Sequence, residues 1–304
     1  MARRLIRNRT VMFLMLLSVL GLGARGLSAI DSTWLITPDR LAALIGSRAP
    51  IVLLHIGDKA EYDAEHIPGA QFISLQDVSD PDAKLRLQMA SVDRLRAAFQ
   101  SRGIGDNTRV VLYMGKDFVT PTARVFVALD YLGLSDRVSI LDGGMPAWKA
   151  TGHRVTAETK PATPGHLTVH PRTDVIVTSD WINDHLADAH VKVLDARTPD
   201  FYTGERAGSF PRPGHIAGAG NVPFDTLTDP TTLTFKDLAA LRQQLENAGA
   251  KPGAEVVTYC HIGQQASALY FVAKLLGYHV HLYDGSFEEW SANPSLPVTR
   301  GGGK

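Results

Sequence analysis

Short apolar runs alternate with amphipathic stretches along most of the chain. The runs "IVLLHI" (51–56), "RVVLYM" (109–114), "VKVLDA" (191–196) and "EVVTYC" (255–260) have the length and composition of buried strands. The stretch "ASALYFVAKLLG" (266–277) instead repeats its apolar residues at helical spacing and closes with a glycine, where helices often end. Strands that alternate with helices predict an α/β fold with parallel sheets covered by helices on both faces.

The whole pattern occurs twice. "HIPGA" (66–70) returns as "HIAGA" (215–219), and "RVVLY", "YLGL" and "LDGGMPAW" return in the same order as "EVVTY", "LLGY" and "YDGSFEEW". The length of 304 residues is also that of two ordinary domains. We therefore expect one domain over residues 31–152 and a second over 176–304, joined by a linker, residues 153–175, that is rich in Pro, Thr and His.

The first 29 residues have the layout of a secretory signal peptide. Arginines at positions 3, 4, 7 and 9 precede an apolar run over residues 11–22, and small residues follow up to Ala29. The apolar run is shorter than the roughly 20 residues that span a bilayer, although an uncleaved membrane anchor is the alternative. We expect an exported, periplasmic protein with no membrane association after residues 1–29 are removed.

Charge and histidine spacing exclude several classes of protein. Lys+Arg and Asp+Glu both number 31, whereas nucleic-acid-binding proteins usually carry a basic excess, so no nucleic-acid partner is expected. His153, His166 and His170 cluster in the linker, but metal-ligand spacing such as H-E-x-x-H is missing from the sequence. The phosphate-binding pattern G-x-x-x-x-G-K-[ST] is missing as well. The sequence therefore predicts a protein that needs no metal and no cofactor.

The chain contains a single cysteine, Cys260, between a predicted strand and a predicted helix. In parallel sheets, ligands bind beyond the carboxyl ends of the strands, which is where Cys260 stands. The loop that follows it leads into the helix, so backbone N–H groups and the positive helix end favour an anion at the sulfur. We expect this setting to lower the pKa of Cys260 well below its ordinary value and to make it a nucleophile. A buried, inert thiol is the alternative.

These motifs together resemble the tandem-domain rhodaneses, a family of sulfurtransferases. The resemblance covers residues from about 34 to 298, and it is carried by "VLDAR" (193–197), "GHIAGA" (214–219), the loop that begins at Cys260, and "YDGSFEEW" (283–290). It implies two tandem rhodanese-like domains, each a parallel sheet flanked by helices, of which only the second is catalytic. It also implies a persulfide intermediate on the cysteine.

The first copy of the repeat lacks the reactive groups of the second. Met114 stands where Cys260 stands, and a thioether cannot become a thiolate; His55 and Gly57 stand opposite Asp195 and Arg197. The loop that follows Met114 in the first copy is also longer than the loop that follows Cys260 in the second. We therefore expect the first domain to be an inactive scaffold that covers and stabilises the second.

The resemblance implies a two-step transfer in which the Cys260 thiolate takes a sulfane sulfur from a donor and passes it to cyanide or a thiol. We expect Arg197 to hold the donor's anionic oxygens and Asp195 to hold Arg197 or the loop. The other residues expected to bind substrate are those of the loop: His261, Ile262, Gly263, Gln264 and Gln265. His261 is expected to add a donor group or a charge, and a neutral surface histidine is the alternative.

The loop also bears on the choice of reaction. His261-Ile262 matches neither the basic pair typical of thiosulfate enzymes nor the small pair of 3-mercaptopyruvate enzymes. We favour thiosulfate, because it is compact and the bulk of His261 fills space that the carbon skeleton of mercaptopyruvate needs. Related phosphatases are expected to carry an arginine at the position of Ala266, so a phosphatase is excluded. Two alternatives remain: a 3-mercaptopyruvate sulfurtransferase, and a non-enzymatic persulfide carrier or rhodanese-like binding module.

Overall fold

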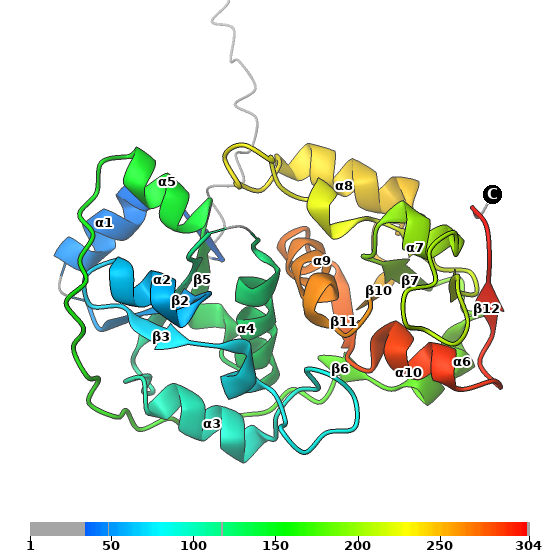
Figure 1. Cartoon of the computed structure of the whole chain (residues 1–304), viewed down its shortest axis with the longest axis horizontal. Helices are drawn as coiled ribbons and strands as arrows, with labels where there is room; N and C mark the ends of the chain where they lie inside the picture. The colour runs from blue at the N-terminus through cyan, green and yellow to red at the C-terminus, as the bar shows by residue number, and fades with distance from the viewer. Residues whose placement is uncertain (1–33, 48, 117, 303–304) are drawn as a thin grey trace, which may run out of the picture.

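The computed structural model describes residues 34–47, 49–116 and 118–302 of the chain, and the predicted signal peptide lies outside them. The described residues form two α/β domains that lie side by side (Figure 1). Each domain is built on a parallel sheet flanked by helices, which confirms the predicted fold class. Among the described residues, none of the helices has the length and apolarity needed to cross a membrane.

The first domain holds a five-stranded parallel sheet in the order β1-β5-β4-β2-β3 within the described part of the chain. Its strands are β1 (Leu35–Ile36), β2 (Ile51–Ile56), β3 (Gln71–Ile73), β4 (Arg109–Met114) and β5 (Val138–Leu141). Its helices are α1 (Pro38–Gly46), α2 (Lys59–Ala64), α3 (Val92–Gln100), α4 (Thr120–Tyr131) and α5 (Gly144–Ala150), with short 3₁₀ turns η2 (Leu75–Val78) and η3 (Ser135–Arg137). Helices α3 and α4 pack on one face of the sheet, and α1, α2 and α5 pack on the other.

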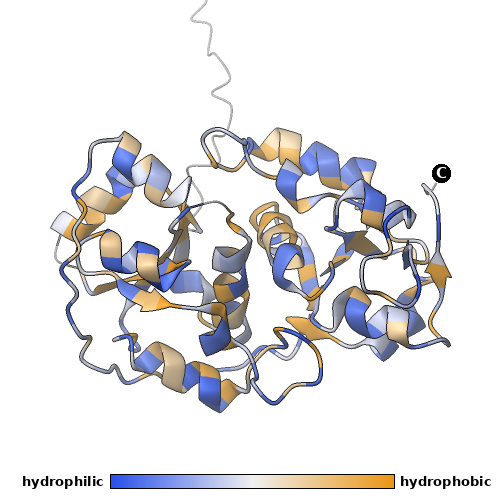
Figure 2. Cartoon of the chain, in the orientation of Figure 1, coloured by the Kyte–Doolittle hydropathy of each residue, from blue (hydrophilic) through white to orange (hydrophobic). Residues whose placement is uncertain are grey.

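The second domain repeats this topology. Its parallel sheet has the matching order β6-β11-β10-β7-β9, from β6 (Ile176–Val177), β7 (Val191–Asp195), β9 (Gly220–Asn221), β10 (Glu255–Tyr259) and β11 (His279–Tyr283). The helices are α6 (Ser179–His185), α7 (Pro199–Thr203), α8 (Leu238–Asn247), α9 (Gln264–Leu275) and α10 (Ser286–Ala292), with the turn η4 (Phe224–Thr226). Strands β8 (His215–Ile216) and β12 (Val298–Thr299) form a small antiparallel pair. Helix α8 carries apolar and polar residues side by side (Figure 2), as a helix with one face on the core should.

The recurring "HI.GA" strings have the same packing role in both domains. In the second domain, His215 stacks on the ring of Tyr202 at 3.8 Å and its Nδ1 donates to the Tyr202 carbonyl, while the Tyr202 hydroxyl donates to the Ala219 carbonyl. His66 and Tyr62 repeat this arrangement in the first domain. Both histidines are buried. These repeat histidines therefore serve the fold rather than chemistry.

The two domains share one apolar interface. Helices α4 and α9 pack against each other, with the rings of Phe126 and Phe271 edge to face at 4.9 Å. The buried carboxylate of Asp130, on α4, accepts from the Tyr270 hydroxyl at 2.7 Å and pairs with Lys274 at 2.8 Å, both on α9. Because this buried charge is paired and hydrogen-bonded across the interface, it fixes how the two domains meet.

Candidate active site

Cys260 directly follows strand β10 and precedes helix α9, as the sequence pattern predicts, and its side chain is 0 % exposed. Residues 261–263 make the tight turn between the two elements. Gly263 has φ +83°, and a Cβ at this position would lie 3.0 Å from Asp284 Oδ1 and 3.1 Å from Arg124 Nη1. Only glycine combines this backbone angle with so little space, so Gly263 sets the shape of the loop.

The loop surrounds the sulfur with donors. The backbone N–H groups of Ile262, Gln265 and Ala266 hydrogen-bond to Cys260 and lower its pKa, and the N-terminus of α9 adds its partial positive charge. Complete burial acts in the opposite direction and is the larger effect, so the pKa of the thiol is raised above its ordinary value. The expectation of a lowered pKa was therefore wrong. The helix position was predicted correctly, but the desolvation of the sulfur was not visible in the sequence.

The "YDGSFEEW" segment forms hydrogen bonds with the backbone of the cysteine loop. The Cys260 N–H donates to Ser286 Oγ at 3.3 Å, and the Ser286 hydroxyl donates to the Tyr283 carbonyl at 2.9 Å. The N–H of Phe287 donates to the Cys260 carbonyl at 3.0 Å, and that of Glu288 to the His261 carbonyl at 3.1 Å. The start of α10 thus fixes the backbone of the cysteine. Sequence reasoning used this motif for the resemblance and missed the role of Ser286.

Asp195 and Arg197 form a buried ion pair beside the cysteine loop. Asp195 ends β7 and pairs with Tyr259 of β10 in the sheet register. Arg197 Nη2 donates to Asp195 Oδ2 at 2.6 Å and to the Gly214 carbonyl at 2.7 Å, and its guanidinium lies 4.0 Å from the ring centroid of Phe287. Arg197 is 1 % exposed. The expectation that Arg197 holds the donor's oxygens has no support in this geometry, because its charge is taken up by Asp195.

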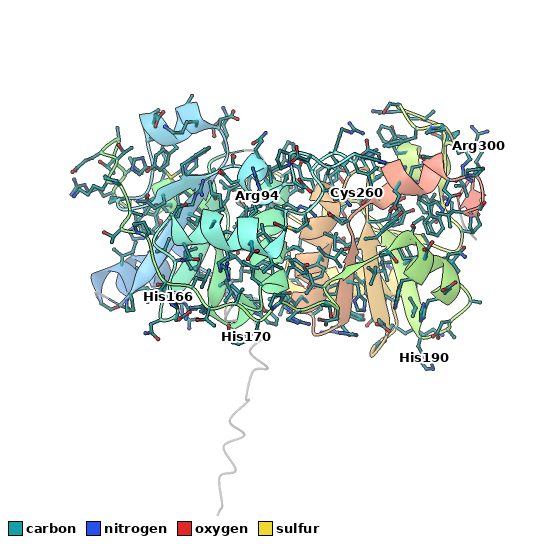
Figure 3. All side chains as sticks on the ribbon, turned by 90° about the horizontal axis from the view of Figure 1, so that it is seen from below. Arg94, His166, His170, His190, Cys260 and Arg300 are labelled. Atoms are coloured by element: carbon teal, nitrogen blue, oxygen red, sulfur yellow. The ribbon has the colours of Figure 1, made fainter. Side chains whose placement is uncertain are left out.

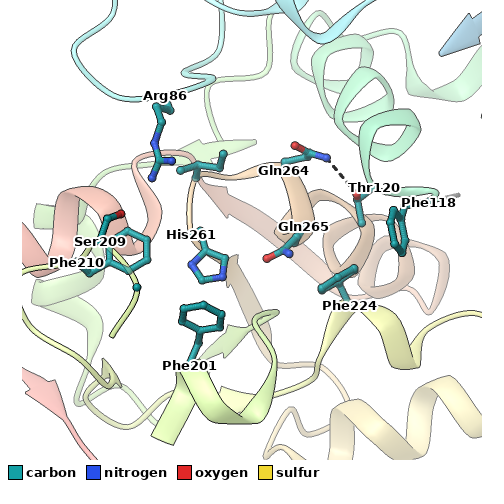
Figure 4. Close-up of a pocket in the computed structure, with 12 residues that line it drawn as sticks. Arg86, Phe118, Thr120, Phe201, Ser209, Phe210, Phe224, His261, Gln264 and Gln265 are labelled. Atoms are coloured by element: carbon teal, nitrogen blue, oxygen red, sulfur yellow. Dashed lines mark hydrogen bonds between the residues drawn. The ribbon is translucent and has the colours of Figure 1, made fainter. Parts of the chain in front are cut away.

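A cavity of about 380 Å³ opens beside the cysteine loop (Figure 4). Its wall is mainly apolar and aromatic, with residues from both domains: Arg86, Phe118, Thr120, Phe201, Gly208, Ser209, Phe210, Phe224, His261, Ile262, Gln264 and Gln265. Four of the five predicted loop residues line it, whereas Gly263 shapes the loop from outside the wall. The four phenylalanines were not predicted as site residues.

His261 is enclosed by two of these aromatic rings. The ring of Phe201 meets it edge to face at 4.5 Å, and Phe210 stacks on it at 5.3 Å (Figure 4). Burial and the nearby positive charge of Arg197 lower the pKa of His261 to about 4. Near neutral pH His261 therefore offers a neutral imidazole, which agrees with the alternative of a neutral histidine and not with the expected charge.

The first domain contributes to the site directly. Arg86 reaches the cavity from the loop before α3 and is the one lysine or arginine among the described residues that line it (Figure 4). Its Nε donates to Glu288 Oε1 at 2.7 Å. Below the cysteine loop, the fully buried Arg124 of α4 pairs with Asp284 Oδ1 at 2.6 Å, and Asp284 Oδ2 accepts from the Met89 N–H. Sequence reasoning gave the first domain a covering role but identified none of these contacts.

Comparison with known proteins agrees with this arrangement. A family model described as Rhodanese-like domain matches residues 37–151 and again residues 178–293. A Thermus thermophilus protein named sulfur carrier protein TtuD is 34% identical over 254 residues, which cover 79% of this chain and 87% of that protein.

Two proteins of Pseudomonas aeruginosa are also similar. One, named thiosulfate sulfurtransferase, is 30% identical over 271 residues, covering 88% of this chain and 97% of its own. The other, named probable 3-mercaptopyruvate sulfurtransferase, is 31% identical over 291 residues, covering 90% and 100%. The chain therefore belongs to the rhodanese family, with two rhodanese-like domains in tandem and relatives that are named sulfurtransferases.

Proposed function

We propose that the protein is a thiosulfate sulfurtransferase that works through a persulfide on Cys260. The observation that carries the proposal is the ring of three backbone N–H groups aimed at the Cys260 sulfur, at the base of a loop that lines a cavity. Fixed N–H donors stabilise negative charge without moving, so they suit both a thiolate and the terminal sulfur of a persulfide.

The proposed reaction has two balanced steps. The Cys260 thiol, whose pKa is raised by burial, first gives its proton to solvent. The thiolate then attacks the outer sulfur of thiosulfate; a new S–S bond forms, the bond to the sulfite sulfur breaks, and sulfite leaves with the electron pair. Cyanide in an assay, or a thiolate in the cell, then attacks the outer sulfur of the persulfide. Thiocyanate or a new persulfide leaves, and the Cys260 thiolate is restored. The steps require no electron carrier and no metal.

Arg86 is the group proposed to attract the anionic donor. Both arginines are paired with a carboxylate, Arg86 with Glu288 and Arg197 with Asp195. Arg86 differs in that it lines the cavity and more than half of its side chain is exposed, whereas Arg197 is buried. A compact dianion can be held between this cation and the loop N–H groups. The remaining wall is largely apolar, so we expect thiosulfate to bind with a high KM.

A second candidate function is persulfide carriage to another protein. Phe118, at the cavity, is 58% exposed, and its ring lies 6.1 Å from that of Phe224. An exposed aromatic ring beside a reactive cysteine suits contact with a partner, and the Thermus thermophilus relative is named a sulfur carrier. In that case the first step is the same and only the acceptor differs.

Steady-state kinetics with two donors test the proposal. With cyanide as acceptor, kcat/KM for thiosulfate should exceed that for 3-mercaptopyruvate, and the Cys260→Ser variant should have no measurable activity with either. The Met114→Leu variant alters the matching position of the first domain and should retain the wild-type kcat. A tenfold preference for 3-mercaptopyruvate would refute the choice of donor. Loading of Cys260 without turnover would favour the carrier.

A further inference from the structure

Three side chains that can bind a metal converge at the end of the second sheet far from the cysteine. Glu255 begins β10, and His279 and His281 lie at the start of β11. Glu255 pairs directly with His279 in the sheet register, and residues two apart on a strand share a face, so all three side chains meet. Figure 3 labels His190, whose carbonyl accepts from the Glu255 N–H, at the end of the domain opposite Cys260.

Both imidazoles direct one nitrogen at the same carboxylate oxygen. His281 Nε2 lies 2.5 Å from Glu255 Oε1, and His279 Nδ1 lies 3.4 Å from it. The two rings are 4.6 Å apart at an interplanar angle of 76°, so they approach the oxygen from different directions. One nitrogen or oxygen from each of the three residues lies within 4.8 Å of the others.

Asp174 holds the outer nitrogen of each ring. Its backbone carbonyl accepts from His281 Nδ1, and its carboxylate oxygen lies 3.4 Å from His279 Nε2. Arg172 fixes that carboxylate through a contact of 2.7 Å. Metal-binding histidines characteristically donate their second ring N–H to a carboxylate or a backbone carbonyl, which orients the ring and selects its tautomer.

The tautomer of His281 is decided by this contact. A carbonyl oxygen only accepts, so Nδ1 of His281 carries a hydrogen, and the close contact of Nε2 with Glu255 Oε1 is held either by a second hydrogen on the ring or by a cation between the two atoms. Two acceptors at this separation repel unless a proton or a cation lies between them. His281 is 3% exposed, so water cannot readily relieve the conflict.

We propose that Glu255, His279 and His281 bind one divalent transition-metal ion, of which Zn²⁺ is the best match. Two imidazoles and a carboxylate without thiolate suit zinc, which accepts three protein ligands and a water. Zinc bonds of about 2.1 Å in tetrahedral geometry place two ligand atoms about 3.4 Å apart. The contact of His279 with Glu255 already has this spacing, whereas the carboxylate has to move away from His281. Glu255 is partly exposed and His279 is 57% exposed, which leaves room for that shift and for a water ligand.

The metal is inferred to act on stability and not on sulfur transfer. Glu255 begins β10 and Cys260 directly follows its other end, about 16 Å away at the usual rise of a strand. The ion would join β10 to β11 and to Asp174, which stands just before β6. A metal that binds only the folded chain stabilises it by RT ln(1 + [L]/Kd), so the Tm keeps rising with the concentration of free metal.

The test is a zinc titration of the full chain without a histidine tag, after removal of metal with a chelator. Calorimetry should give one zinc per chain, and the Tm should rise with zinc concentration. His279→Ala and Glu255→Gln should each weaken binding at least tenfold and abolish the shift in Tm. His190→Ala, which removes an exposed histidine from the same end of the domain, should keep both. These variants are used because His281 is buried and its replacement could impair folding.

Two results would overturn the proposal. One is the absence of saturable zinc binding by the wild-type chain. The other is binding that survives in both His279→Ala and Glu255→Gln. Because a thiol also binds zinc, the titration is repeated with Cys260→Ser, and binding lost in that variant alone would place the ion at the cysteine instead. Unchanged binding in Cys260→Ser supports the site at Glu255.

Discussion

Replacing Asp195 with asparagine separates a structural role of Arg197 from a role in donor binding. The substitution keeps the shape of the side chain and removes its charge. Asp195 and Arg197 are both fully buried, and the carboxylate takes hydrogen bonds from the Arg197 backbone N–H, Nε and Nη2. Without the charge, the guanidinium keeps the Gly214 carbonyl and the ring of Phe287 but no counter-ion.

The expected loss of stability is large. Breaking a buried pair leaves an uncompensated charge, which typically costs about 3–5 kcal/mol. For a protein of this size the Tm should fall by roughly 10 °C. Urea unfolding followed by tryptophan fluorescence measures the change. The control is Asp63→Asn, which breaks the exposed pair with Lys59 and should cost less than about 1 kcal/mol.

The same variant also reports on the chemistry. The negative charge of Asp195 raises the pKa of Cys260, so its removal should lower the pKa of the thiol, measured by thiolate absorbance. The thiosulfate KM should stay near the wild-type value if Arg197 is structural. An Asp195→Asn protein that is as stable as the wild type but has a thiosulfate KM raised tenfold would refute this reasoning.

Two further predictions follow, one from the cavity and one from two histidines, the buried His55 and the partly buried His261. Arg86→Ala should raise the thiosulfate KM about tenfold with little change in kcat, because about 1.4 kcal/mol of charge attraction is lost. Lys84→Ala, in the same exposed loop, should leave the KM unchanged. Equal effects of the two substitutions on KM would contradict a specific role for Arg86. Burial lowers the pKa of His55 and His261 to about 4, so the unfolded chain takes up protons below pH 6.5 while the folded chain does not. The free energy of unfolding should therefore fall between pH 6.5 and 4 by up to about 3 kcal/mol per group, and urea unfolding that is constant over this range would refute the two shifts.

The fold could be predicted from the sequence because its signals are local and occur twice. Buried parallel strands give short apolar runs, and the repeat of "HIPGA" as "HIAGA" aligned the two domains. The same pattern placed Cys260 between a strand and a helix, where the loop N–H groups reach its sulfur. The signal peptide and the export of the protein stay predictions, because residues 1–33 lie outside the described part of the structure.

The rest of the site depends on contacts between distant segments. Arg197 looks like an anion-binding residue in sequence, and only packing shows that Asp195 and Phe287 enclose it. Burial lowers the pKa of His261, and the rings that enclose it are Phe201 of α7 and Phe210 of the loop before β8. Arg86 lines the same cavity but belongs to the first domain.

The group of Glu255, His279 and His281 was missed for a similar reason. Its members lie on two neighbouring strands, so no spacing motif along the chain marks them. The expectation of no metal was based on such motifs within single segments, and it could not take account of side chains that the sheet register brings together.

Mass spectrometry of the intact protein after incubation with thiosulfate tests the central proposal most directly. The wild-type chain and Met114→Leu should each gain the mass of one sulfur atom, and peptide mapping should locate it on Cys260. Addition of cyanide should remove it with release of one equivalent of thiocyanate, and Cys260→Ser should gain nothing. A wild-type chain that stays unmodified under conditions of measurable turnover, or a Cys260→Ser chain that still acquires the sulfur, would contradict the persulfide mechanism.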